Sequence, residues 1–169
     1  MKELLELPNF PTTHMPPFDR LTWRLTVDGL VSTPLNLTYD ELLELPGVSQ
    51  VSPFACVEGW KVSDNRWEGI AVRTLLDKAV PLPGARYVIF HAGDFYISLS
   101  LATVLKPTAI LAYNLNGAPL APEHGYPLRL VVPDKQCYYG IKWVQRLEVV
   151  RRARQSGKTI ALGRVRRTP

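Results

Sequence analysis

The amino-acid sequence predicts a mixed α+β domain in which strands dominate and the helices are short. Short alternating or apolar runs recur along the chain, and turn-forming residues separate them at close intervals. The 15 prolines and 11 glycines among 169 residues also favour many short elements joined by turns. Strand and helix patterns do not alternate regularly, so a doubly wound parallel sheet is not expected. A mostly antiparallel or mixed sheet fits this pattern best.

The first part of the chain contains one strand, one capped helix and one extended run. Residues 21–30 alternate between polar and apolar side chains, which predicts a strand. Thr38 and Glu41 have the spacing of a capping box, which predicts a short helix that the following Pro-Gly pair ends. The chain is then expected to run extended over residues 48–56.

The second part is expected to begin with a short helix and a hairpin. The helix spans residues 72–79 and turns Leu75 and Leu76 inward, before a Pro-Leu-Pro-Gly turn. Strands over 86–91 and 95–99 are joined by a tight turn. The remaining expected elements are a helical piece near 101–105 and strands over 110–115, 128–132 and 142–150, with the turn residues Asn116 and Gly117 after the first of these strands.

Positive charge is concentrated at the C-terminal end. Seven of the 20 Lys and Arg residues lie in 151–169, which contain no acid, so residues 1–150 carry 13 bases against 15 acids, or −2. The overall charge of +5 is therefore weak evidence for nucleic-acid or membrane binding by the folded body. We expect one domain over 1–150 and a solvated basic tail over 151–169, with contact to an acidic partner or a phosphate-bearing surface as the alternative.

Cys56 and Cys137 are too few for the disulfide framework of a small secreted domain, so two free thiols are expected. Together with the three histidines they show neither C-x-x-C nor H-x-x-x-H spacing, which argues against zinc. Residues 1–8 contain no long apolar run and no twin-arginine signal. The sequence therefore predicts a cytoplasmic protein with no membrane span, unless a leader has been removed.

Cys56 lies in the segment Phe-Ala-Cys-Val-Glu-Gly-Trp, between apolar residues. A thiolate favours soft, redox-active metals, yet one cysteine cannot build a zinc or iron-sulfur site. A metal at Cys56 would therefore have to bring most of its own ligands. Considered alone, the residue fits a buried structural thiol equally well.

Four segments, in order, resemble the sulfite oxidase family of molybdenum-pterin enzymes over about residues 10–150. Ordered agreement of several motifs is more specific than any one motif. The resemblance implies the family's molybdopterin-binding fold, which is mixed and mostly β with short helices, and a molybdenum-molybdopterin cofactor. The matching segments are Thr13-His14-Met15-Pro16-Pro17, the Cys56 segment, residues 111–120, and residues 123–133 continued by Gly140-Ile141-Lys142-Trp143-Val144.

The resemblance also implies roles for individual residues. Cys56 would be the protein's ligand to molybdenum. Arg129 could grip the cofactor's phosphate with two parallel donors, whereas Lys142 would supply a point charge. Charges that reach from a strand edge into solvent are the alternative for both residues. The positions that match pterin-holding residues are His14, Asp94, His124, Arg129 and Lys142.

The residues at the family's substrate-binding positions match less completely. Lys61 stands where sulfite-oxidising members have an arginine, Thr12 stands at another arginine position, and no tyrosine follows Val150. Lys61 could still attract an oxyanion, with a solvent-facing lysine beside a buried indole as the alternative, so Cys56 and Lys61 are the catalytic candidates. We expect oxygen-atom transfer to or from a small sulfite- or sulfoxide-like substrate.

The electron partner and one alternative function complete the prediction. The chain has no C-x-x-C-H haem motif and no iron-sulfur cysteine set, so a separate electron-transfer partner is expected. Because substrate-side residues depart from the family pattern, a non-catalytic binding module that keeps the fold is the alternative. A nucleic-acid partner is not expected.

Overall fold

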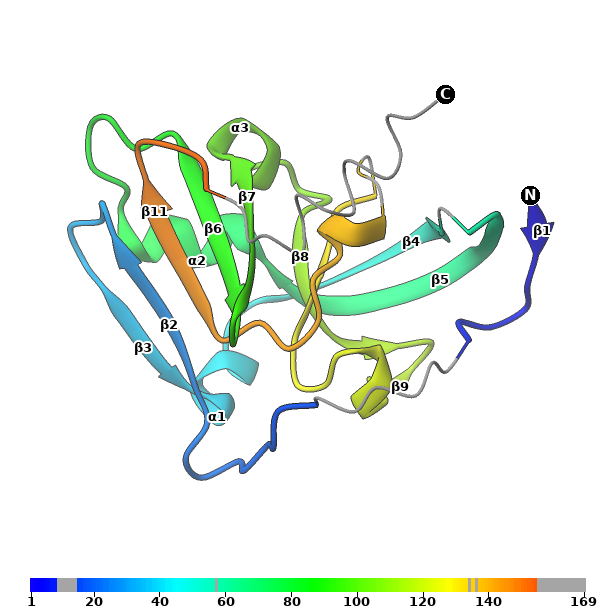
Figure 1. Ribbon diagram of the computed structural model, residues 1–169. Coiled ribbons are helices and arrows are strands. Elements are labelled where there is room, and N and C mark those ends of the chain that lie inside the picture. Colours follow the sequence, from blue (N-terminus) through cyan, green and yellow to red (C-terminus); the bar gives the residue numbers. More distant parts are fainter. Residues whose placement is uncertain (9–14, 57, 134, 136, 155–169) are drawn as a thin grey trace.

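A computed structural model describes residues 1–8, 15–56, 58–133, 135 and 137–154, and Figure 1 shows their arrangement. The strands form two sheets and the helices are short, which confirms the predicted fold class. No helix in the described part of the chain is long and apolar enough to cross a membrane.

One sheet has five strands in the order β3-β2-β11-β6-β7. Strand β11 pairs in parallel with β2 and antiparallel with β6, so the last strand of the domain is central. The predicted hairpin is formed by β6 and β7. The strands of this sheet are β2 (Arg24–Gly29), β3 (Leu35–Thr38), β6 (Tyr87–Ala92), β7 (Phe95–Ser100) and β11 (Arg146–Val150).

The other sheet has six strands and contains the long hairpin of β4 and β5. Strand β5 also pairs with β8 and, in parallel, with the short N-terminal strand β1. Strand β10 completes the path by pairing with β8. The strands are β1 (Lys2–Glu3), β4 (Gly47–Ala55), β5 (Trp60–Ala71), β8 (Ile110–Leu115), β9 (Ala118–Pro119) and β10 (Arg129–Val131).

Helices α1 and α2 lie where the sequence predicts them. The capping box of α1 (Tyr39–Leu43) is present: Thr38 Oγ1 accepts from the Glu41 N–H at 3.1 Å, and the Glu41 carboxylate accepts from the Thr38 N–H at 2.8 Å. Helix α2 (Val72–Ala79) follows β5 directly. The other helices are α3 (Leu101–Val104) and the 3₁₀ helices η1 (Pro122–His124) and η2 (Cys137–Tyr139).

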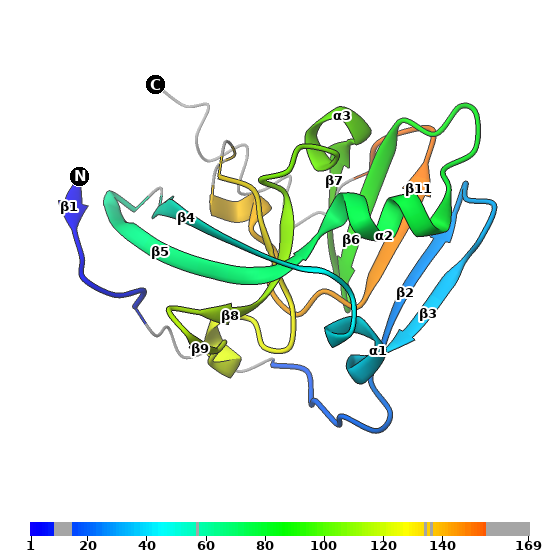
Figure 2. The same ribbon diagram turned by 180° about the vertical axis from the view of Figure 1, so that it is seen from behind.

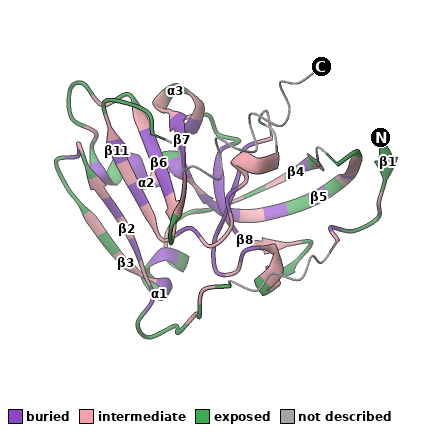
Figure 3. Ribbon diagram, in the orientation of Figure 1, coloured by how far each residue is buried: buried purple, intermediate pink, exposed green. Residues whose placement is uncertain are grey.

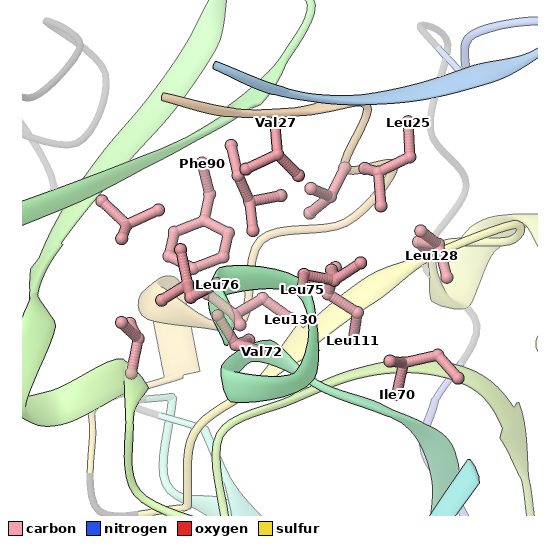
Figure 4. Close-up of a cluster of buried hydrophobic side chains, with 14 of the residues drawn as sticks. Leu25, Val27, Ile70, Val72, Leu75, Leu76, Phe90, Leu111, Leu128 and Leu130 are labelled. Carbon is pink, nitrogen blue, oxygen red and sulfur yellow. The ribbon is translucent and has the colours of Figure 1, made fainter. Parts of the chain in front are cut away.

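The main core lies where α2 meets the two sheets. Figure 2 shows α2 crossing a face of the five-stranded sheet, and Figure 4 shows Leu75 and Leu76 of α2 among apolar side chains such as Val27, Phe90 and Leu111. Leu75 and Leu76 are fully buried, as predicted. Figure 3 shows that burial is concentrated in this region, whereas β1 is exposed.

Two strand predictions need correction, and the strand expected over 21–30 is shorter, at Arg24–Gly29. The last strand was expected over 142–150, but β11 begins only at Arg146. Trp143 has φ +58°, a left-handed conformation that cannot continue a strand. The twelve-residue β5 was not predicted, because polar side chains interrupt the apolar alternation along its first half.

The β4–β5 hairpin places Cys56 at its turn. The Cys56 N–H donates to the Trp60 carbonyl at 2.8 Å, and the Gly59 N–H donates back to the Cys56 carbonyl at 3.2 Å. Gly59 has φ +90°, which a residue without Cβ adopts at little cost. A register shift between Ser52 and Phe54 marks an irregularity in the ladder just before the turn.

Candidate functional site

A cavity lies between the C-terminal end of β4 and the segment that follows β10. Phe54, Ala55 and Trp67 line it on the hairpin side, and Arg129 and Cys137 line it on the other side. The space inside is about 100 Å³, whereas sites that enclose drug-sized ligands hold roughly 300–1,000 Å³. The cavity therefore accommodates only one end of a larger molecule.

Arg129 is a buried cation without an acidic partner within the described residues. Its side chain is almost fully buried, and Nη1 donates to the His124 carbonyl at 3.1 Å. The guanidinium carbon lies 4.8 Å from the Phe54 ring centroid and 5.6 Å from that of Trp67. Burial lowers the pKa of Arg129 to about 10, against a small opposing effect of Cys137. The group still carries its charge at neutral pH.

One N–H donor of the Arg129 side chain has no acceptor among the described residues. Its Nε is buried and has no hydrogen-bond partner in the part of the chain that the structure describes. A buried donor without a partner costs about 1–3 kcal/mol, and it marks a position where an acceptor is missing. An anionic oxygen that enters the cavity would supply that acceptor.

Lys142 places a second cation beside the first. The backbones of Arg129 and Lys142 form an isolated antiparallel bridge, and the Lys142 ammonium donates to the Glu123 carbonyl. Burial and the charge of Arg129 lower the pKa of Lys142 to about 8, although Glu123 acts in the opposite direction. Two neighbouring cations, neither ion-paired with a described carboxylate, are suited to a phosphate.

His124 lies at the end of η1, next to both cations. Burial and then the charge of Arg129 lower the pKa of His124, and the backbone of Pro8 and Leu7 only partly opposes this effect. The imidazole is therefore neutral near pH 7. Its Nε2 is buried without a partner among the residues described, so it can serve as a directional hydrogen-bonding group for a polar heterocycle.

Gly125 allows these side chains to come together. Its φ is +114°, and a Cβ built there would lie 3.0 Å from the Lys142 Cβ and 3.1 Å from the Arg129 Cβ. Any larger residue would combine backbone strain with close contacts. Glycine at this position thus maintains the contact between the turn and the two cations.

Cys56 and Cys137 are both half-buried free thiols in this structure. Burial raises the pKa of Cys56, a backbone hydrogen bond at Glu58 lowers it, and Cys137 raises it again as a close hydrogen-bonding neighbour. No sequence motif selects Cys137, which lies in a polar segment. Its place beside Cys56 results from the tertiary approach of η2 to the hairpin turn.

The other predicted site residues are not part of this cluster, or they lie outside the described residues. Lys61 is paired with Ala55 in the β4–β5 hairpin, next to Cys56, but its ammonium forms an ion pair with the Glu3 carboxylate at 2.9 Å, and both side chains are partly exposed. Asp94 is exposed in the turn between β6 and β7, in the other sheet. His14 lies outside the described residues. The roles of these three residues stay predictions.

Comparison with known proteins supports the same assignment of the fold and cofactor. The family model described as oxidoreductase molybdopterin binding domain matches residues 12–158. An uncharacterized oxidoreductase of Bacillus subtilis, YuiH, is 36% identical over 145 residues, which cover 83% of this chain and 73% of that protein. The protein-methionine-sulfoxide reductase catalytic subunit MsrP of Gluconobacter oxydans is 32% identical over 159 residues, which cover 83% of this chain and 51% of that protein.

Among solved structures, the sulfane dehydrogenase SoxCD from Paracoccus pantotrophus superposes with a TM-score of 0.75 at 25% identity. The match covers 82% of this chain and 41% of that chain. The present chain thus spans about half of MsrP and less than half of the SoxCD chain, while it spans most of the Bacillus protein.

Proposed function

Because the chain belongs to the oxidoreductase molybdopterin binding domain family, we propose that it binds molybdenum-molybdopterin and transfers an oxygen atom to or from a small sulfur-containing substrate. When bound, this cofactor supplies a metal that changes its oxidation state by two electrons and exchanges oxygen with substrate. The support from this chain is the pair of buried cations, Arg129 and Lys142, beside the cavity next to Cys56.

The cluster matches the chemistry of the cofactor group by group. Arg129 has an unused donor for a phosphate oxygen, and Lys142 adds charge at the same end. The neutral imidazole of His124 would face the polar pterin ring of the cofactor. Cys56 is the metal ligand, and the turn of the β4–β5 hairpin holds its backbone by two hydrogen bonds. His14 and Asp94 are proposed to hold the remaining part of the pterin.

The substrate is proposed to be sulfoxide- or sulfite-like. Two relatives support this class, because one is named a protein-methionine-sulfoxide reductase and the other a sulfane dehydrogenase. Lys61 is the candidate that attracts an oxyanion, a role in which the substrate would replace Glu3 as the partner of its ammonium group. Electrons are proposed to pass through a separate redox protein, since the sequence has no haem or iron-sulfur motif of its own.

The cofactor assignment is tested by metal and pterin content. Protein purified from a host that makes the cofactor should contain close to stoichiometric molybdenum and pterin. Cys56→Ser should lose the metal or alter its spectrum, and Arg129→Met should lose pterin. Arg73→Met is the matched control, because Arg73 is an exposed cation on α2 paired with Asp77. Absence of both metal and pterin from the native protein would contradict the proposal.

A binding module without turnover is the second candidate, and the ion pair between Lys61 and Glu3 favours it. Glu3 offsets the charge that the substrate pocket would otherwise present. Cofactor-loaded protein should be assayed for reduction of methionine sulfoxide with a reduced dye as the electron donor. Turnover establishes the enzyme, whereas stoichiometric cofactor without turnover of sulfoxide or sulfite identifies the module.

A further inference from the structure

The two cysteines of the chain lie at opposite sides of the cavity, where Cys137 lines it and Cys56 directly follows a lining residue. Cys56 follows Ala55 on the hairpin wall, and Cys137 lines the facing wall in η2. The two residues are 81 positions apart in the sequence (137 − 56). Cys137 lines the same small cavity as Ala55, the residue before Cys56, and it lies close enough to Cys56 to raise the pKa of that thiol.

The side chain of Arg129 connects the two walls. On one side its guanidinium group stacks on Phe54, two residues before Cys56, at 4.8 Å from the ring centroid. On the other side it lies against the turn that begins at Cys137, where the Gly140 N–H donates to the Cys137 carbonyl at 2.9 Å. A Cβ at Gly140 would lie 3.7 Å from Arg129 Nη2 and 3.2 Å from the Cys137 carbonyl oxygen. The approach of the two cysteines thus follows from the packing of both walls on one buried side chain.

We propose that Cys56 and Cys137 form a reversible intramolecular disulfide in the cofactor-free protein, and that reduction of this bond is required before the cofactor can bind. The inference rests on the proposed function, because it takes Cys56 as the ligand to molybdenum. A sulfur atom held in a disulfide has no thiolate to offer a metal. The disulfide and the cofactor therefore exclude one another.

The oxidant for this bond is a small disulfide such as oxidised glutathione. One cysteine loses its proton and attacks a sulfur of the oxidant, which releases one glutathione thiolate and leaves a mixed disulfide on the protein. The second cysteine then displaces the other glutathione. Overall, two protein thiols are oxidised to one disulfide and one glutathione disulfide is reduced to two glutathione thiols. The two protons leave with the glutathione.

The bond is detected in cofactor-free protein from a host that cannot make the cofactor. After treatment with oxidised glutathione, the native chain should lose both titratable thiols and the mass of two hydrogens, with no glutathione adduct. Digestion without reductant should release the two cysteine peptides as one linked species. The matched variants Cys56→Ser and Cys137→Ser should instead carry a stable glutathione adduct on the cysteine that remains. An adduct on the native chain, or thiols that survive the treatment, would overturn the proposal.

A second measurement needs no variant and so does not depend on how the variants fold. Phenylarsine oxide bridges two thiols only when they are adjacent. Reduced native protein should bind it in a one-to-one complex that a dithiol removes, and oxidised protein should not bind it. Lack of binding by the reduced protein would contradict the close approach of the two thiols.

The effect on loading is tested with pterin cofactor released from another molybdoenzyme. Reduced protein should retain pterin through gel filtration, and oxidised protein should retain only background until a reductant is added. Equal retention by both forms would refute the required reduction. If the reduced form retains no pterin, the result contradicts the proposed cofactor site. The disulfide would still be established by the mass measurement.

Discussion

The most specific physical prediction concerns the partly buried ammonium group of Lys142. In the unfolded chain this group keeps its proton up to its ordinary pKa of 10.5, but in the folded protein burial and Arg129 lower that pKa to about 8. Between these two values the unfolded chain binds more protons than the folded one. The free energy of unfolding of the cofactor-free protein should therefore rise as the pH increases above 8.

The size of this rise follows from the two pKa values. The full difference between the pKa values of 10.5 and about 8 corresponds to roughly 3 kcal/mol in the free energy of unfolding. Lys142 is only partly buried, so solvent screening reduces the effect, and only part of it develops by about pH 9.5. We expect a gain of about 1 kcal/mol between pH 7 and about pH 9.5.

Urea denaturation followed by tryptophan fluorescence measures this gain, with Lys142→Met as the matched variant. Methionine keeps much of the side-chain volume and removes the titration. The raised pKa values of Cys56 and Tyr39 lower the stability at high pH, but these contributions are common to both proteins and cancel in the difference. Parallel pH profiles for native and variant protein would refute the reasoning.

Three further substitutions, the first with a matched control, test the packing around the site, the packing of the core and the phosphate-binding role of Arg129. Gly125→Ala should cost about 2 kcal/mol or more in urea denaturation, because φ is +114° and the new methyl group would meet Lys142; Gly93→Ala, with φ +57° and open space, should cost only about 1 kcal/mol. Leu75→Ala should cost about 2–5 kcal/mol by the same assay, since the side chain is fully buried, and a loss below 1 kcal/mol would contradict its place in the core. Arg129→Lys should retain less pterin than native protein after gel filtration, because an ammonium group lacks the paired donors that match a phosphate; equal retention would show that charge alone suffices.

Sequence patterns predicted those elements whose signals are local. The capping box at Thr38 and the apolar face of α2 each lie within a few residues, and both are present in the structure. The hairpin of β6 and β7 was similarly visible from two apolar runs and the turn between them. Strand β5 was missed because its pairing with β4 and β8, rather than an alternating pattern, determines its conformation.

The candidate site was predicted only in part, for a physical reason. Cys56, His124, Arg129 and Lys142 were identified through the family resemblance, and the structure gathers the last three into one cluster next to the cavity. The location of Cys137 depends on the tertiary contact between η2 and a hairpin turn 81 positions earlier (137 − 56), and no local pattern encodes that contact.

The ion pair of Glu3 and Lys61 shows the same limit at the N-terminus. Strand β1 has only two residues, and its charged sequence does not predict a parallel pairing with β5. Once the pairing forms, it brings the Glu3 carboxylate to the Lys61 ammonium and to the Ser63 N–H. The electrostatic character of the proposed substrate side therefore depends on a segment that carries no recognisable motif.

The two buried cations link the stability of the protein to its proposed cofactor. In the cofactor-free state Arg129 and Lys142 repel one another, and Arg129 keeps an unused donor in a buried position. Such an arrangement lowers stability, and a phosphate would relieve both costs at once. A ligand that binds only the folded state also stabilises it by mass action. Loaded protein should thus unfold at a higher urea concentration than cofactor-free protein. The rise in stability above pH 8 should also disappear, because a bound phosphate raises the lowered pKa of Lys142 back toward its ordinary value.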